Sequence, residues 1–337
     1  MKSLLKKLLK YIIPQRIALQ IGSWKTYIIG EDGDVKDLES SVIVEEKFGK
    51  NMVAGVDFVC IDRGLVNWHK EWPIKRREVA RFEDACFYFN YIFSQHLHRK
   101  SLHIYSSVSP CTTEVDFRAL IDAISSSRQV RKASFVFEPI AAAIGMGIDL
   151  QREIYILDIG HTATIFSVIS DNKLEYAHDI YSPCIFDEAV RALERIMIEK
   201  RIRVSKRQLM RILRVIKEED TYLVYGPNAI THKPMEVEMT REQVISCYSP
   251  TIKGIIDKVK AFMIEKNISL SAESPLYVIG GGSCLAGIPE MFAEAGIEII
   301  IPKDSDKVIA LGLHKIAQEK FDYSIDRDNV IFKETSS

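Results

Sequence analysis

The sequence predicts an α/β protein built from two related domains. The chain has 337 residues, and at about 150 residues per domain this length suggests two domains with sizeable cores. Predicted strands and helices alternate along most of the chain. Two strands also end in the same kind of turn, Leu19–Gly22 and Leu157–Gly160, 138 residues apart. This repeat indicates an internal duplication, which would give two α/β domains facing a cleft of the kind in which phosphates bind.

The composition excludes several classes of protein. Hydrophobic residues make up 47% of the chain, with 17 Gly and 11 Pro, so it is too apolar for a disordered chain and too poor in Gly and Pro for a fibrous one. The six cysteines show no C-x-x-C spacing and lie mostly in apolar runs. That pattern is typical of reduced cytosolic thiols rather than of disulfides or a zinc site. A net charge of −1 argues against a nucleic-acid partner.

The near-neutral charge hides a basic N-terminal segment. Residues 1–30 carry six bases and no acid, whereas the rest of the chain has 39 bases against 46 acids. Within residues 1–13, aliphatic side chains recur at helical spacing and lysines recur on another face, until Pro14 ends the predicted helix. The segment has neither the lysine-free apolar core nor the cleavage site of a signal peptide. The sequence also has no run of about 18 apolar residues that would span a bilayer as a helix.

We expect residues 1–14 to form a basic amphipathic helix that lies in the plane of an anionic membrane surface. Each lysine near such a surface contributes about 1 kcal/mol to binding. The alternative is a helix packed on its own domain or a frayed terminus, and the density of lysines favours the membrane. The residues expected to contact the membrane are Leu4, Leu5, Lys6, Leu8, Leu9, Lys10 and Ile12.

In the first half of the chain, short apolar runs separated by turn residues predict strands. A hairpin is expected from Ile17, with turns at residues 22–23 and 31–34, and further strands at 41–45, 51–61, 101–109 and 133–137. Apolar residues at three- and four-residue intervals predict a helix over 79–93. Two more helices are expected at 113–125, which begins with a capping-box pattern, and at 139–147.

The second half predicts a similar alternation. A buried strand at 154–160 is expected to pair with 165–169, and a second strand pair is expected over 223–239 around Gly226–Asn228. Helices are predicted at 187–200, 205–217, 240–266 and 306–319. Shorter strands are predicted at 275–279, directly before three glycines, and at 296–301.

Taken in order, six segments resemble motifs of the actin superfamily, most closely of its bacterial MreB branch. The most specific is Phe-Glu-Pro-Ile-Ala-Ala-Ala-Ile-Gly at 137–145, which is similar to E-E-P-M-A-A-A-I-G. The turns at 20–26 and 158–170 match the two phosphate hairpins of the family, D-L-G-T-x-N-T and D-I-G-G-G-T-T-E-V-A-V-I-S. Residues 279–288 and 308–313 resemble the adenosine loop T-G-G-G-A-L-L-x-G-L and the motif V-A-x-G-A-G. A D-E-A motif recurs at 187–189.

The resemblance implies an α/β, actin-like ATPase fold, with two related α/β domains, each ribonuclease H-like, around a nucleotide cleft. It divides the chain into the helix of residues 1–14, domain I at 15–150 plus 306–337, and domain II at 151–305. It also implies ATP and Mg²⁺ as ligands. Some members of the branch begin with a short basic amphipathic helix, as this chain is expected to do.

Binding ATP in such a fold requires backbone N–H groups near the phosphates, carboxylates for the water shell of Mg²⁺, and a polar group that orients the attacking water. The resemblance implies that Glu138 positions this water and that Asp158 holds Mg²⁺ through water. The nucleotide-binding residues that it implies are Gly22, Ser23, Trp24, Lys25, Asp158, Gly160, His161, Thr162, Ala163, Arg211, Gly280, Gly281, Gly282, Ser283 and Cys284.

The chain departs from the family at several of these positions. Gln20 stands where the family has an aspartate, His161 and Thr162 replace two glycines, and Ala163 replaces a threonine hydroxyl. Leu213 removes an acceptor from the helix that normally offers Lys and Glu to the nucleoside. Loss of one oriented polar group costs about 2–4 kcal/mol of transition-state stabilisation. We therefore expect ATP hydrolysis that is slow or absent, so that the chain is at most a slow ATPase.

The function that the resemblance implies is that of an MreB-like cytoskeletal filament protein. It would be cytoplasmic, peripheral on the inner face of the cell membrane, and would organise cell shape and cell-wall synthesis. Its expected partners are other copies of itself, the anionic membrane surface, a second MreB-like protein and membrane morphogenesis proteins.

Three alternatives remain at this stage. A degenerate actin-fold scaffold or regulatory subunit would bind nucleotide poorly and act with a typical paralogue, and the altered hairpins favour it. An actin-fold kinase needs a catalytic base, and Gln20 removes the obvious candidate. A division-type actin would carry its membrane helix at the C-terminus, where this chain is polar.

The membrane hypothesis predicts the effect of replacing Leu5, Leu8 and Leu9 together with glutamate. The full chain should then no longer co-sediment with anionic liposomes, because the apolar face is lost and the added charge is repelled. Zwitterionic liposomes are the control that shows how much of the binding is electrostatic. Undiminished sedimentation of the variant with anionic liposomes would show that this segment is not the anchor.

Overall fold

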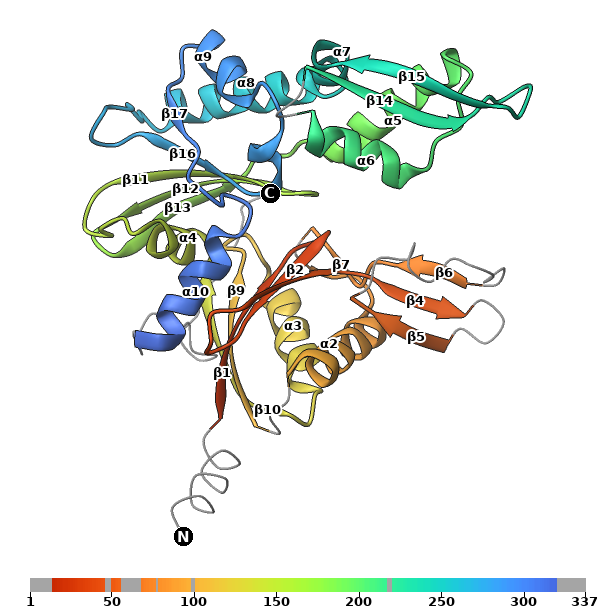
Figure 1. Cartoon of the computed structure of the whole chain (residues 1–337). Helices are drawn as coiled ribbons and strands as arrows, with labels where there is room; N and C mark the ends of the chain where they lie inside the picture. The colour runs from red at the N-terminus through yellow and green to blue at the C-terminus, as the bar shows by residue number, and fades with distance from the viewer. Residues whose placement is uncertain are drawn as a thin grey trace. The chain divides into compact units, whose positions relative to one another are not determined.

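The computed structural model describes residues 14–45, 50–55, 68–76, 78–97, 101–216 and 220–319. The chain forms two compact units, coloured in sequence order in Figure 1. Unit 1 takes in residues up to 151, residues 171–174 and residues from 307 on, and unit 2 takes in residues 152–170 and 175–306. The helix predicted for residues 1–13 lies outside the described residues. Among the described helices, none is both long and apolar enough to span a membrane.

Unit 1 is built on a five-stranded sheet of order β10-β9-β1-β2-β3. Strands β1, β2 and β3 form an antiparallel meander, and β9 and β10 run parallel to β1. Their bounds are β1 Gln15–Ile21, β2 Lys25–Ile29, β3 Val35–Glu39, β9 Leu102–Val108 and β10 Val130–Phe137. The two predicted turns of the hairpin, at residues 22–23 and 31–34, are confirmed.

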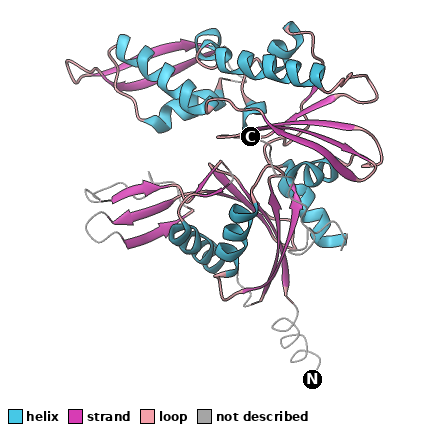
Figure 2. Ribbon diagram, turned by 180° about the vertical axis from the view of Figure 1, so that it is seen from behind, coloured by secondary structure: helices cyan, strands magenta, loops and turns pink. Residues whose placement is uncertain are grey.

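Helices cover both faces of this sheet (Figures 1 and 2). One face carries α2 (Phe82–His96) and α3 (Glu114–Ser125), and the other carries α4 (Glu138–Met146) and α10 (Val308–Glu319). The alternation of side chains along β1 explains this arrangement. Ile17 and Leu19 belong to the core cluster with α2 and α3, whereas Gln20 is hydrogen-bonded to α10.

Unit 1 also contains two small antiparallel sheets. The first has the order β5-β4-β6, and the second pairs β7 with β8. Their bounds are β4 Val42–Glu45, β5 Lys50–Ala54, β6 Trp68–Glu71, β7 Ile74–Lys75 and β8 Glu78–Val79. The strand predicted over 51–61 is therefore described only as far as Ala54.

Unit 2 repeats the topology of the first sheet, with the order β13-β12-β11-β16-β17. As in unit 1, the first strand pairs with an antiparallel hairpin partner on one side and a parallel strand on the other. The bounds are β11 Ile154–Ile159, β12 Thr164–Ser170, β13 Lys173–Asp179, β16 Leu276–Ile279 and β17 Ile299–Ile300. The shared strand order is what an internal duplication predicts.

The remaining elements of unit 2 are mostly helical. Its helices are α5 Ile185–Glu199, α6 Lys206–Val215, α7 Arg241–Ser246, α8 Ser249–Glu265, α9 Ile288–Glu294 and the 3-10 helix η2 Gly281–Cys284. A separate hairpin pairs β14 (Thr221–Pro227) with β15 (Pro234–Thr240). Its turn therefore comes after the predicted position at residues 226–228. Gly226 is instead a strand residue, where an added Cβ would lie 2.3 Å from the Arg203 carbonyl oxygen.

The prediction of one helix over 240–266 is wrong, because the chain forms α7 and α8 with a break at Cys247–Tyr248. Pro250 explains the break, since proline lacks the N–H that a continuous helix needs and its ring clashes with the carbonyl oxygen four residues before it, at Ser246. The Tyr248 hydroxyl then donates a hydrogen bond to the Ala286 carbonyl oxygen at 2.7 Å, which anchors the break in the core.

In unit 1, α4 and α10 cross at two glycines. A Cβ added to Gly145 would lie 2.1 Å from the Val308 carbonyl oxygen, and one added to Gly312 would lie 1.7 Å from the Ala141 carbonyl oxygen. Both distances are far below van der Waals contact, and in both cases the neighbour is backbone that cannot rotate away. The two helices therefore pack closely only while these positions have no side chain.

This contact predicts that Gly312→Ala destabilises the protein by about 1–3 kcal/mol, because the extra methyl must push α10 away from α4. The matched control is Gly254→Ala in α8, where an added Cβ meets nothing within 4 Å. The control should be neutral or stabilise by up to about 1 kcal/mol, since alanine favours helix over glycine. Thermal unfolding of both variants measures the difference, and equal melting temperatures would contradict the packing argument.

Candidate functional site

In unit 1 the turn between β1 and β2 is tight and depends on a glycine. The Gly22 N–H donates to the Lys25 carbonyl oxygen at 2.9 Å, and a Cβ at this position would lie 2.7 Å from the same oxygen. Ser23 is buried within the turn. Trp24 stacks on Trp72, with ring centroids 4.9 Å apart. The structure therefore places the first group of predicted site residues on one short, well-packed turn.

Lys25 is one of the predicted nucleotide-binding residues. In the structure its ammonium group forms an ion pair with Asp37 on β3 and lies 5.8 Å from the ring centroid of Tyr27. Its charge is therefore already balanced by a carboxylate of the neighbouring strand. Both partners are partly exposed, so the pair contributes little to stability.

Gln20 has a structural role that the sequence did not reveal. Its side-chain oxygen accepts a hydrogen bond from the backbone N–H of Ala310, at 3.0 Å, in the first turn of α10. The first N–H groups of a helix have no partner within the helix, so the amide acts as a cap. A neutral side chain at this position is thus used to hold α10 on β1, and it carries no charge for a metal.

Glu138 is the first residue of α4 and directly follows β10. Its side chain is only 5% exposed, and the positive end of the helix dipole stabilises a carboxylate there. Because β1 and β10 both run parallel to β9, their carboxyl ends lie at the same edge of the sheet. The structure therefore brings Gln20, the Gly22 turn and Glu138 to one edge of unit 1.

In unit 2, Asp158 lies near the end of β11 and is 7% exposed. Gly280, directly after β16, has a φ of +86°, and a Cβ there would lie 2.4 Å from Oδ1 of Asp158. An added Cβ at Gly282 would likewise lie 2.3 Å from Cγ2 of Ile159. Both glycines are therefore required for the loop to approach the end of β11, where it lies against the predicted metal carboxylate.

The loop of residues 280–284 is fixed by Ser305, a residue that was not predicted. The Ser305 carbonyl oxygen accepts from the Gly280 N–H at 2.9 Å, and its hydroxyl lies 2.7 Å from Oγ of Ser283 and 3.5 Å from Sγ of Cys284. Gly281 contrasts with its neighbours, since an added Cβ would meet only the Phe186 ring, at 3.9 Å. The loop is thus held in place but leaves bare backbone at Gly281, as the close approach of a nucleotide requires.

The turn between β11 and β12 contains the other predicted hairpin residues. The Gly160 N–H donates to the Ala163 carbonyl oxygen at 2.9 Å, and Thr162 is partly exposed. The imidazole of His161 stacks on Phe186, with centroids 5.5 Å apart and planes 11° apart. Burial lowers the pKa of His161 to about 4, so at neutral pH this side chain is uncharged and does not offer phosphate a cation.

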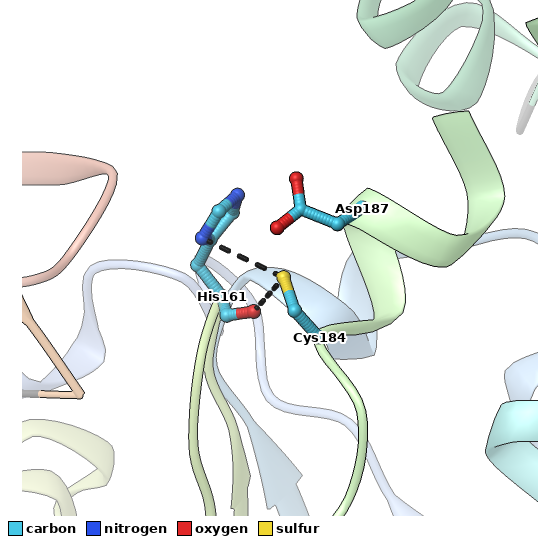
Figure 3. A group of neighbouring side chains, drawn as sticks. All are labelled: His161, Cys184 and Asp187. Carbon is cyan, nitrogen blue, oxygen red and sulfur yellow. Dashed lines mark hydrogen bonds between the residues drawn. The ribbon is translucent and has the colours of Figure 1, made fainter. Parts of the chain in front are cut away.

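Two neighbours of His161 were missed by the sequence reasoning, namely Cys184 and Asp187 at the start of α5 (Figure 3). Their side chains meet the imidazole although they are 23 and 26 residues away in sequence. The replacement of a family glycine by His161 was the available signal, but it did not indicate a partner.

The last predicted residue, Arg211, is exposed on α6, whereas Leu213 is fully buried. Among the described residues, Arg211 makes no hydrogen bond or ion pair with the loop of residues 280–284. The structure therefore brings together Asp158, the glycine loop and the β11–β12 turn in unit 2, but it does not bring Arg211 to them.

Comparisons with known proteins agree with this architecture. A model of the MreB/Mbl protein family matches residues 7–324. A crystal structure of MreB5 of Spiroplasma citri bound to AMPPNP is 17% identical, with a TM-score of 0.75, and covers 91% of this chain and 97% of that chain. The ADP-bound structure of the same protein is 18% identical, with the same TM-score and coverage. A MamK double helical filament is 13% identical, with a TM-score of 0.71 over 91% of this chain and 99% of that one.

A search of curated proteins by sequence found no match. At such low identities the structural likeness shows the fold, which is actin-like and confirms the predicted fold class. The family match covers most of the chain and confirms the predicted resemblance. The chain therefore belongs to the MreB/Mbl family.

Proposed function

We propose that the chain is an actin-like filament subunit that binds nucleotide but hydrolyses ATP slowly or not at all. The observation that carries the proposal is the hydrogen bond from Ala310 to Gln20, because it gives a structural role to the position where the family motif has a charged carboxylate. The fold is retained while part of the phosphate chemistry is lost. Membership of the MreB/Mbl family and the likeness to a MamK filament support self-assembly.

Nucleotide binding is supported by the geometry of the glycine loop and of Asp158 in unit 2. The loop around Gly281 has bare backbone, and the buried carboxylate of Asp158 lies beside it. Asp158 would hold Mg²⁺ through water, and the ion would neutralise charge on the phosphates. The likeness to MreB5 structures bound to AMPPNP and to ADP supports the same ligand class.

Slow turnover is supported by three side chains that do not offer a free charge to the metal or the phosphates. Gln20 carries no charge, the charge of Lys25 is paired with Asp37, and His161 is neutral at physiological pH. Catalysis of phosphoryl transfer depends on positioning the reacting groups and on balancing the charge that develops in the transition state. These changes should therefore reduce the rate of ATP hydrolysis more than they reduce the affinity for ATP. Glu138 would still orient water if hydrolysis occurs.

In the cell, we propose that filaments lie on the inner face of the membrane through residues 4–12 and help to organise cell shape and cell-wall synthesis. This part rests on the pattern of lysines and aliphatic residues in the sequence. A weak anchor is sufficient in a filament, because many copies bind the surface together.

A second candidate function is that of a regulatory subunit that assembles only with a more typical MreB-like protein. The side chains of His161, Thr162 and Ala163 in the hairpin favour it, since they occupy positions where relatives expose backbone or a hydroxyl.

The experiment that separates the two functions uses the purified full chain with ATP, with ADP and without nucleotide. Sedimentation and electron microscopy detect filaments, and phosphate release measures turnover. Filaments of this chain alone, with slow phosphate release, support the first function. Nucleotide binding without self-assembly supports the second, and the absence of both binding and assembly would contradict the filament proposal.

Gly281→Ala should weaken ATP binding by about ten-fold or more, which corresponds to at least about 1.4 kcal/mol. The added methyl would cover the bare backbone of the loop, while inside the protein it meets only Phe186 at ordinary contact distance. Binding of a fluorescent ATP analogue measures the effect, with Gly254→Ala as the matched control. Equal affinity in both variants would show that this loop does not bind the nucleotide.

Gln20→Asp should raise Mg²⁺-dependent ATP hydrolysis, by as much as about 10²-fold if the missing carboxylate limits the rate. The first turn of α10 stabilises an anion as well as an amide, so the substitution should be tolerated. Gln20→Asn is the matched control, because it has the same size without the charge. If both variants hydrolyse ATP at the wild-type rate and remain folded, the loss of charge at this position is not the limiting defect.

A further inference from the structure

Three side chains of different chemistry meet at the β11–β12 turn (Figure 3). His161 comes from the turn, Cys184 directly precedes α5, and Asp187 lies in the first turn of that helix. One nitrogen, one sulfur and one carboxylate oxygen from these residues all lie within 4.8 Å of one another. All three residues are partly buried, so the group is shielded but accessible from solvent.

The spacing agrees with the geometry of a tetrahedral metal centre. With metal–nitrogen bonds of about 2.0–2.1 Å and metal–sulfur bonds of about 2.3 Å, two neighbouring ligands of a tetrahedral ion are about 3.6 Å apart. Nδ1 of His161 lies 3.8 Å from Sγ of Cys184. Only small side-chain movements would therefore be needed to place both atoms on one ion.

The set of donors also selects the class of metal. Imidazole and thiolate suit zinc and similar transition metals, whereas Mg²⁺ and Ca²⁺ prefer oxygen ligands alone. Nδ1 of the imidazole, which already lies near Sγ of Cys184, would supply the nitrogen lone pair. Asp187 adds a negative charge that partly balances the ion.

The surroundings support each ligand. Phe186 stacks on the imidazole and fixes the plane of the ring. Cys184 is the N-cap residue of the 15-residue helix α5, whose N-terminus favours an anion. Such outer contacts are typical of metal centres in proteins.

Two existing interactions would have to change on binding. The Cys184 thiol donates to the His161 carbonyl oxygen at 2.7 Å, and Asp187 forms an ion pair with Lys206 at 3.4 Å. The thiol proton would pass to water as the metal–sulfur bond forms. Lys206 is well exposed, so its ammonium group can leave Asp187 at little cost.

We propose that unit 2 contains a binding site for a divalent transition metal of the zinc class, with His161, Cys184 and Asp187 as ligands. Three protein ligands leave a fourth position for water or for another ligand. The ion would join the β11–β12 turn to the start of α5 and would place positive charge on the turn that lacks it. The inference does not depend on the proposed function, because it uses only these side chains and no nucleotide.

The test is a titration of the metal-free, tag-free full chain with Co²⁺, which reports on its ligands by absorption. We expect one cobalt ion to bind with a thiolate-to-cobalt charge-transfer band and the visible bands of a tetrahedral site, and Zn²⁺ to displace it. Cys184→Ser should abolish the charge-transfer band. His161→Gln and Asp187→Asn should each weaken binding by at least about ten-fold.

Matched controls are Cys111→Ser and Glu188→Gln, an acid that is adjacent to Asp187 in the first turn of α5. Both controls should bind Co²⁺ as the wild type does. As an independent readout, Zn²⁺ should raise the melting temperature of the wild type and of the controls. At the same Zn²⁺ concentration it should raise that of Asp187→Asn less, and this variant changes only a partly exposed side chain. Absence of the charge-transfer band in the wild type, or its persistence in Cys184→Ser, would overturn the proposal.

Discussion

The structure of unit 1 depends on the attachment of its last helix to its first strand. Gln20 and Ala310 are 290 residues apart, yet the amide of Gln20 caps α10 directly. The same helix crosses α4 at Gly145 and Gly312, where the two backbones are too close for any side chain. Because unit 1 is discontinuous in the sequence, these contacts close it around the sheet. The chain leaves unit 1, forms unit 2 and returns to unit 1 through α10.

This attachment also bears on function. A carboxylate at position 20 would serve a metal ion and the helix at once, whereas the amide serves the helix alone. The fold therefore tolerates the loss of charge, since α10 needs an acceptor and not an anion. In unit 2, Gly280 and Gly282 likewise keep the loop close to β11, whereas the neighbouring turn carries the imidazole of His161. The glycines of the loop at residues 280–282 are present, whereas Gln20, His161, Thr162 and Ala163 differ from the family motifs.

The sequence predicted the features that depend on local pattern. The two turns of the first hairpin, the helix after β10 and the internal duplication all follow from apolar periodicity and from glycines close to them in the chain. The break at Tyr248 was missed because apolar periodicity continues from α7 into α8, although Pro250 prevents the two from forming one helix. The edge strand β13 was missed because its side chains are mostly exposed and show no clear alternation.

Contacts between distant segments were beyond such reasoning. Among the nucleotide residues, the pairing of Lys25 with Asp37 and the role of Ser305 depend on how strands and loops come together. The meeting of His161 with Cys184 and Asp187 is of the same kind, and cysteine spacing along the chain gave no sign of it. The sequence was thus sufficient to align these positions with a family, but only the structure shows which residues their side chains contact.

The central claim is that this chain keeps the assembly of an actin-like protein while losing fast ATP turnover. The most direct test follows sedimentation and phosphate release together in one sample of the wild-type chain with ATP and Mg²⁺. The account predicts that filaments form and that phosphate release lags far behind assembly. Release of phosphate at the pace of assembly, with at least one phosphate for each subunit added, would contradict it.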